Sequence, residues 1–324
     1  MSDKFDALPI VLVQLGQIPN HLKRNLEYLS LTFPTKDRYL ITDSKDWKWI
    51  QDLGFQVISS ETLLSSWPEK FQVIDRRKYF RNNFWFSTKA RLILLPNFMK
   101  TFGLNRILHI ESDVWIHPDF PFEFLIGIKN PLAYPKMDED RGIASILLIN
   151  GEDGADLLER CCLEWPNHTD MEILGKAISA GYDIYELPST TKFNSNTESN
   201  WIFDGAKLGM YLFGADPMNS KGVIRRFSAS PLGQLAPDER ITLTGNRFLL
   251  EANDSDKRIA NLHLHSKNSK MFRLEWATVL KRQLVLESIH AKYSFSVVAW
   301  FKSMIELSQR AGRKVRRIAR HSGT

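Results

Sequence analysis

The first sixty residues alternate short apolar runs with helical stripes of leucine, and this alternation constrains the fold more than any other feature. The apolar runs have the length of buried strands, and the stretches between them repeat apolar residues every three or four positions. The expected strands are residues 9–15, 38–43 and 55–58, and the expected helices are residues 20–31 and 47–53. Strand, helix, strand order predicts a doubly wound α/β fold, in which ligands bind at the carboxyl ends of the strands.

Two carboxylates follow a further expected strand. A helix is expected at residues 84–103, and the apolar strand at residues 106–110 comes after it. The strand runs into Glu111-Ser112-Asp113, and an apolar run at residues 114–116 follows. Carboxylates two positions apart point to the same side of an extended chain, so both can approach one hard divalent cation. The alternative is a solvated strand end at which both carboxylates meet water or a lysine.

Two histidines and a lysine alternate with other residues near the end of the chain. If residues 261–267 are extended, His263, His265 and Lys267 lie on one side of the strand. A neutral imidazole can ligate a divalent metal, and an ammonium beside it can neutralise a phosphate. The alternative is a pair of histidines that are solvated or hydrogen-bonded in the core.

Composition fits a globular enzyme, since 43% of the residues are hydrophobic and 25% are charged. The net charge of +6 equals the six arginines and lysines that follow Gln309 without any acidic residue, so the rest of the chain is neutral overall. This distribution argues against a nucleic-acid groove across the body. The apolar stretch at residues 293–307 leads into this basic tail and resembles an anchor on an anionic membrane surface. The alternative is a C-terminal helix packed on the core.

We expect neither a signal peptide nor a membrane-spanning segment, because the first residues are polar and partly acidic and no apolar run reaches spanning length. Its only cysteines, Cys161 and Cys162, are neighbours and fit a reducing compartment. We therefore expect a cytoplasmic protein, which would attach peripherally to the inner face of the membrane if the tail is an anchor rather than a packed helix. The turn at residues 16–19 has neither a dinucleotide fingerprint nor a phosphate loop, which disfavours those enzyme classes.

The second half supplies further polar residues at the ends of predicted elements. Residues 143–150 read as a strand ending in Asn150, and Thr169 can cap a helix that begins with Asp170. A short strand at residues 185–188 follows. Asp204 lies in an aromatic turn that could form an acceptor platform, or alternatively caps a helix.

The order of these motifs resembles nucleotide-sugar glycosyltransferases of the GT-A fold. The shared order is an acidic-x-Asp element, a strand ending in Asn, an Asp-x-x-Ile-Leu helix start, Leu-Pro followed by Asn, and a late His with a Lys. It covers about residues 9–270 and is most similar to the retaining glycosyltransferase family 8 and its relatives. Glu111 replaces the usual Asp, Met171 replaces the usual Gln, and the late His-Gly-Lys-Pro-Trp string is absent.

The resemblance implies a GT-A type fold, with a Rossmann-like, mostly parallel central sheet flanked by helices and a C-terminal helical extension. The implied glycosyltransferase domain spans residues 1–275, with a donor half at about 1–120 and an acceptor half at about 121–275. Residues 276–324 would form a C-terminal helix and the basic tail.

The resemblance also implies roles for individual residues. Asp113 matches the direct ligand of Mn²⁺ or Mg²⁺, Glu111 contacts the metal or the donor ribose, and one of His263 and His265 completes the metal site. The implied contacts to a nucleoside-diphosphate sugar are Asp43 at the base or ribose, Lys89, Arg91, Asn194, and Lys267 at the diphosphate. Asp170 matches the carboxylate that faces the transferred sugar.

These residues predict a metal-dependent glycosyltransferase that moves a sugar to a saccharide or lipid-linked acceptor, with retention implied by the resemblance. A divalent cation and a lysine would stabilise the diphosphate leaving group. A further carboxylate must deprotonate the acceptor or stabilise the sugar cation, and Asp170 and Asp204 both remain candidates. Two alternatives are a metal-dependent nucleotidyltransferase or phosphohydrolase, which would use the same ligands on a phosphoester, and a non-catalytic sugar-binding module.

Overall fold

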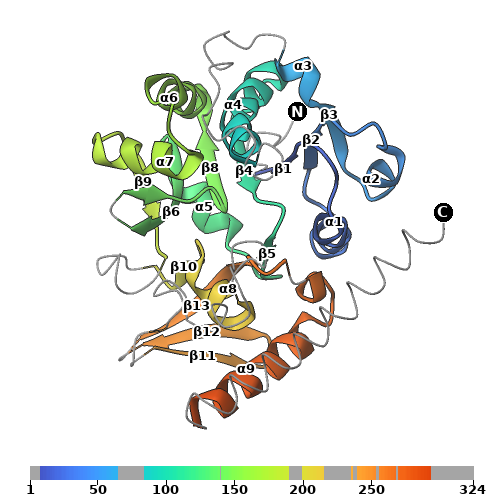
Figure 1. Ribbon diagram of the computed structural model, residues 1–324, viewed down its shortest axis with the longest axis vertical. Helices are drawn as coiled ribbons and strands as arrows, with labels where there is room; N and C mark the ends of the chain where they lie inside the picture. The colour runs from blue at the N-terminus through green and yellow to red at the C-terminus, as the bar shows by residue number, and fades with distance from the viewer. Residues whose placement is uncertain are drawn as a thin grey trace, which may run out of the picture.

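The protein folds around two β-sheets (Figure 1). The computed structural model describes residues 8–64, 84–138, 140–189, 199–214, 235, 239–252, 255–267 and 269–292. The larger sheet has the order β3-β2-β1-β4-β8-β6-β7, with β9 paired to β6, and the smaller sheet has the order β10-β13-β12-β11, with β5 paired to β13.

The strands of the larger sheet are β1 (Ile10–Gln14), β2 (Arg38–Thr42), β3 (Gln56–Ser59), β4 (Arg106–Ile110), β6 (Leu132–Asp138), β7 (Arg141–Gly142), β8 (Ile146–Asn150) and β9 (Ile184–Leu187). Strands β3, β2, β1 and β4 pair in parallel, as does β6 with β9, whereas β8 is antiparallel to both β4 and β6. The carboxyl ends of β1 to β4 therefore meet along one edge.

The strands of the smaller sheet are β5 (Val114–Ile116), β10 (Trp201–Phe203), β11 (Glu239–Thr244), β12 (Arg247–Ala252) and β13 (Ser255–His263). The helices are α1 (Asn20–Thr32), α2 (Lys48–Asp52), α3 (Ser60–Leu64), α4 (Phe84–Phe102), α5 (Phe122–Gly127), α6 (Gly151–Glu164), α7 (Asp170–Ser179), α8 (Lys207–Phe213) and α9 (Trp276–Lys292). A short 3₁₀ helix, η4, spans Ser269–Met271.

The two faces of the larger sheet belong to different hydrophobic cores. Alternate residues of β1 point to opposite faces, so that Ile10 and Leu12 pack with α1 while Val11 packs with α4. Helices α6 and α7 join α4 on its face. The α1 core continues into the smaller sheet and α9, which lies along that sheet in Figure 1. The larger sheet is thus covered on both sides, as its apolar strands require.

The chain passes from one sheet to the other between β4 and β5. Only Glu111, Ser112 and Asp113 separate the two strands. Strand β5 then pairs antiparallel with β13, placing His263 opposite Val114. The residues that link the two sheets are those singled out as a metal site.

The predicted fold class is confirmed, since the structure is α/β with a mostly parallel central sheet, flanking helices and a helical extension at α9. The strands and helices expected over residues 9–58 are all present within one or two residues of the predicted bounds. The division at residue 275 stays a prediction. The basic tail lies outside the described residues.

The expectation of an extended chain over residues 261–267 is wrong beyond His263. Strand β13 ends there, although the next residue still pairs with the neighbouring segment, since Leu264 N donates to Asp113 O (2.8 Å). The chain then turns, with Lys267 N donating to Leu264 O (2.7 Å) and Lys267 adopting φ +56°.

Among the helices of the described residues, none combines the length and the apolar character needed to cross a membrane.

We expect Gly175→Ala to destabilise the protein, because α7 crosses the β6-β7 hairpin in direct backbone contact. A Cβ atom at Gly175 would lie 1.9 Å from the carbonyl oxygen of Asp140. Relieving this overlap should lower the free energy of unfolding by about 1–3 kcal/mol in urea denaturation. Gly127→Ala is the matched control, since a Cβ there meets nothing within 4 Å. Equal stability of the two variants would contradict the expected close approach.

Candidate metal centre

The Glu111-Ser112-Asp113 segment is held in place by backbone and side-chain hydrogen bonds from several elements. Val114 N donates to Glu111 O (3.1 Å), which closes a tight turn between β4 and β5. The side chain of Asn25, fully buried on α1, donates through Nδ2 to the carbonyl oxygens of Ser112 and Val114, both at 3.1 Å. The carbonyl groups on either side of Asp113 are therefore tied to α1.

Glu111, Asp113 and His263 bring one ligand atom each within 4.8 Å of one another. His263 Nε2 lies 3.3 Å from Glu111 Oε2 and 3.4 Å from Asp113 Oδ2. Asp113 and His263 are buried, and the Glu111 side chain is only 11% exposed. Glu111 and Asp113 come from the segment between β4 and β5, and the pairing of His263 with Val114 brings the end of β13 beside them.

Two cationic side chains contact the carboxylates of this group. Arg91, on α4, forms ion pairs with Glu111 and, at 2.5 Å, with Asp170 at the start of α7. Lys267, in the turn after β13, forms an ion pair with Asp113. Buried carboxylates are costly unless they are paired, so these contacts make the cluster compatible with folding.

The charges within the group shift each other's titration. Burial on its own would raise the pKa of Glu111, but Arg91 and His263 lower it overall. Burial opposes ionisation of Asp113 in the same way, yet Lys267 and His263 hold the pKa of Asp113 well below its usual range. Burial on its own would lower the pKa of His263, whereas Asp113 and Glu111 raise it to about 9. The group is thus a mutually stabilised set of opposite charges.

The donor set fits a divalent cation. Glu111 Oε2 is buried, and within the described part of the chain no group donates a hydrogen bond to it, because its approach to His263 Nε2 lacks hydrogen-bond geometry. His263 Nδ1 donates to Gly205 O (2.5 Å), which leaves Nε2 as the ligating nitrogen. Two carboxylates and one imidazole suit Mn²⁺ and related transition metals better than Mg²⁺, which prefers oxygen ligands alone.

His265 is not part of the three-residue group. Its ring stacks on that of His263, with the centroids 4.0 Å apart. Burial, followed by the neighbouring His263, lowers the pKa of His265 to about 3, so the imidazole is neutral. The two histidines were equal candidates in the sequence. In the structure His263 faces the two carboxylates, and His265 stacks on its ring.

Asp170 and its helix follow the sequence expectation closely. Thr169 Oγ1 accepts from Glu172 N (3.3 Å) and Thr169 N donates to Glu172 Oε2 (2.8 Å), a complete capping box. The box fixes the first turn of α7, and the Asp170 carboxylate there reaches Arg91. Arg91 thereby connects Asp170 to Glu111.

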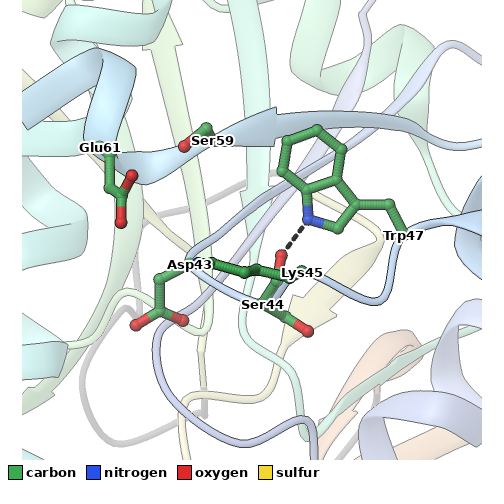
Figure 2. Close-up of a pocket in the computed structure, with 6 residues that line it drawn as sticks. All are labelled: Asp43, Ser44, Lys45, Trp47, Ser59 and Glu61. Atoms are coloured by element: carbon green, nitrogen blue, oxygen red, sulfur yellow. Dashed lines mark hydrogen bonds between the residues drawn. The ribbon is translucent and has the colours of Figure 1, made fainter.

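Asp43 lies in a cavity of about 320 Å³ at the carboxyl ends of β2 and β3 (Figure 2). The cavity is lined by Asp43, Ser44, Lys45, Trp47, Ser59 and Glu61. Asp43 Oδ1 accepts from Gly16 N (2.8 Å), which links the cavity to the turn after β1. In Figure 2 the Asp43 and Glu61 carboxylates lie on one side and the Trp47 indole on the other.

The remaining predicted residues lie in other surroundings. The Lys89 ammonium donates to the carbonyl oxygen of Pro166, between α6 and α7. Asp204 is fully buried, and its carboxylate accepts hydrogen bonds from backbone N–H groups of α8 and β13. Asn194 lies outside the described residues.

Sequence reasoning missed Asn25 and Gly205, whose contacts orient Asp113 and His263. Asn25 reads as an ordinary residue of an amphipathic helix, although a fully buried amide on the apolar face of that helix is an unusual signal. Gly205 acts through its carbonyl oxygen, which no residue type reveals.

Comparison with known proteins identifies no family for this chain. No family model matches it, and no curated protein matches it. Solved structures that resemble it include the galactosyltransferase LgtC in complex with donor and acceptor sugar analogs, at 11% identity and a TM-score of 0.42, covering 91% of this chain and 100% of that one. The apo-form glycosyltransferase GlyE from Streptococcus pneumoniae TIGR4 is 16% identical with a TM-score of 0.38, covering 56% of this chain and 45% of that one. The chain therefore spans less than half of GlyE.

A cytidylyltransferase from Leptospira borgpetersenii serovar Hardjo-bovis is also similar, at 11% identity and a TM-score of 0.32, covering 57% of this chain and 76% of that one.

We expect the metal-free protein to lose stability between about pH 6.5 and pH 9. The folded pKa of His263, at about 9, exceeds its ordinary value, so the stabilisation is complete below pH 6.5 and vanishes as pH rises through 9. The loss should be on the order of 2–3 kcal/mol in urea denaturation with a chelator present. His263→Gln should show a flatter profile over this range, and an unchanged profile would contradict the assignment.

Proposed function

We propose that the protein is a metal-dependent glycosyltransferase that uses a nucleoside-diphosphate sugar as donor. The observation that carries the proposal is the buried group of Glu111, Asp113 and His263, flanked by Arg91 and Lys267 at the carboxyl edge of a wound sheet. This edge is where such folds bind their ligands. The motif order described above points to sugar transfer among the reactions that use this kind of site.

A Mn²⁺ ion held by Glu111, Asp113 and His263 would supply Lewis-acid stabilisation of the leaving diphosphate. Lys267 is the residue placed to add a second positive charge. Its side chain is 38% exposed, and its ammonium contacts Asp113, so it stands at the solvent side of the group. With a cation held at Asp113, the Lys267 ammonium would be the side chain placed to contact a phosphate oxygen of the donor.

The cavity at Asp43 is the proposed place of the nucleoside. Its Asp43 and Glu61 carboxylates can accept hydrogen bonds from ribose hydroxyls and repel a diphosphate, while Trp47 offers an aromatic face to a base. Strands β2 and β3 lie two and three positions from β4 in the sheet. Strand spacing puts the cavity about 10–15 Å from Glu111, a gap that a nucleoside diphosphate bridges.

Asp170 is the proposed carboxylate for the transferred sugar. It is 3% exposed and shares Arg91 with Glu111, so it borders the metal group directly. The resemblance implies retention of the anomeric configuration. An NMR spectrum of the product formed from an α-linked donor should then show an α-glycoside, and a β-glycoside would exclude retention.

A screen of UDP, GDP and CMP sugars with Mn²⁺ tests sugar transfer against the alternative phosphoester chemistry. Transfer or hydrolysis should release a nucleoside diphosphate from a UDP or GDP sugar, whereas turnover of CMP sugars alone would contradict a diphosphate donor. Turnover confined to plain nucleotides would instead assign the site to a nucleotidyltransferase or phosphohydrolase.

Asp113→Ala should abolish metal-dependent donor binding. Loss of a direct ligand is expected to weaken Mn²⁺ binding by more than the roughly 10- to 100-fold that loss of an outer-shell partner costs. Calorimetric titration of the active donor with and without Mn²⁺ measures the effect. Asp119→Ala is the matched control, because Asp119 is an exposed carboxylate paired with Arg258. Equal donor affinity with and without Mn²⁺ in the unaltered protein would refute metal dependence.

The acceptor is proposed to be a saccharide or a lipid-linked glycan at an anionic membrane surface. Six basic residues after Gln309, preceded by the apolar stretch at residues 293–307, support a surface attachment. Removing residues 293–324 should abolish cosedimentation with anionic vesicles and leave the metal site intact. Unchanged sedimentation of the shortened protein would exclude the tail as the attachment.

A further inference from the structure

The turn between β10 and α8 is hydrogen-bonded to the end of β13 through a single buried carboxylate. Asp204 is fully buried. Its Oδ1 accepts from Leu208 N (2.9 Å), and its Oδ2 accepts from Gly209 N (2.8 Å) and from His263 N (3.0 Å). One side chain thus binds the first turn of α8 and the backbone of a metal-site residue at once.

The side chain of Asn261, on β13, forms two hydrogen bonds with the backbone of the same turn. Asp204 N donates to Asn261 Oδ1 (3.0 Å), and Asn261 Nδ2 donates to Asp204 O (2.9 Å). Both side chains are fully buried, where hydrogen bonds of this kind are costly to break. The backbone of the turn is therefore fixed relative to β13.

The fixed turn sets the orientation of the imidazole. The next carbonyl in the turn, Gly205 O, accepts from His263 Nδ1 at 2.5 Å. A carbonyl oxygen only accepts, so this contact requires a proton on Nδ1 and directs Nε2 toward Glu111 and Asp113. The position of one carbonyl oxygen thereby determines which nitrogen is available to a metal.

Glycine at position 209 lets α8 approach closely enough for these bonds. A Cβ there would lie 2.0 Å from the carbonyl oxygen of His263. Any side chain at this position would push α8 away from β13 and lengthen the contacts of Asp204.

We propose that Asp204 and Asn261 are positioning residues that hold His263 ready for metal binding through the Gly205 carbonyl. This role rests on the proposed metal site. It assigns Asp204 to the support of the site, and leaves the sugar-facing carboxylate to Asp170. Asp204 has no solvent-accessible surface, and both of its oxygens already accept backbone N–H groups.

The test is a Co²⁺ titration of the full chain, in which the visible absorption of the bound ion reports binding. A competition experiment then measures how well Mn²⁺ displaces the Co²⁺. Asp204→Asn places an amide NH₂ against backbone N–H donors, and Asn261→Ala removes both strand-side bonds. Each variant should weaken Co²⁺ binding by about 10- to 100-fold and alter the absorption bands at saturating metal. Gly209→Ala should act in the same direction by displacing α8.

Asn150→Ala is the matched control. Asn150 is a buried amide with two hydrogen bonds to backbone carbonyls, and it pairs with Arg106 at the opposite end of β4 from Glu111. It should lose stability, as judged by thermal melting, and keep the affinity and the spectrum of bound Co²⁺.

The outcomes separate the two proposals. If the folded variants at Asp204, Asn261 and Gly209 bind Co²⁺ like the control, the positioning role is wrong and the metal site stands. If the unaltered protein binds no Co²⁺, the metal site and the positioning role fall together. If Asp204→Asn does not fold, Asn261→Ala, which keeps the Asp204 carboxylate bonds, decides.

Discussion

The pairing of β5 with β13 is the interaction on which the site depends. It joins segments about 150 residues apart in the chain and sets His263 opposite Val114, one residue from Asp113. Side chains alternate between the faces of a strand, so a slip of one residue would turn the imidazole away from both carboxylates. Asn25 on α1 reinforces the register by binding carbonyl groups on either side of Asp113. The group of Glu111, Asp113 and His263 therefore forms only when both sheets are in place.

Locally encoded features were predictable, and long-range contacts were not. The strands and helices of the first sixty residues follow from apolar periodicity, and the cap at Thr169 follows from its residue type. The end of β13 was misjudged because Lys267 adopts a positive φ in the turn that follows, a conformation that its residue type does not indicate. The contact of Arg91 with both Glu111 and Asp170 depends on the packing of α4 and α7 onto the central sheet, which no sequence pattern specifies.

Asp170 and Asp204 were equivalent in the sequence, and their partners distinguish them. Among the described residues, the carboxylate of Asp204 accepts hydrogen bonds from three backbone N–H groups, so its position is tied to the path of the main chain. The carboxylate of Asp170 is paired with a side chain, Arg91, which also serves Glu111. A side-chain pair can rearrange when a ligand arrives, whereas a backbone cap cannot without unwinding α8. This difference supports the proposed role of Asp170 at the transferred sugar and the proposed role of Asp204 as a positioning residue.

The charge balance of the cluster is compatible with the proposed metal site as well as with the metal-free form. Glu111, Asp113 and Asp170 carry three negative charges, of which Arg91 offsets one. In the metal-free form, protonated His263 and Lys267 offset the other two. A divalent cation carries the same charge as those two groups together, so its arrival would let His263 lose a proton and Lys267 leave Asp113 without a net change of buried charge. Lys267 would then be available to the diphosphate of the proposed donor, whose negative charge it can offset.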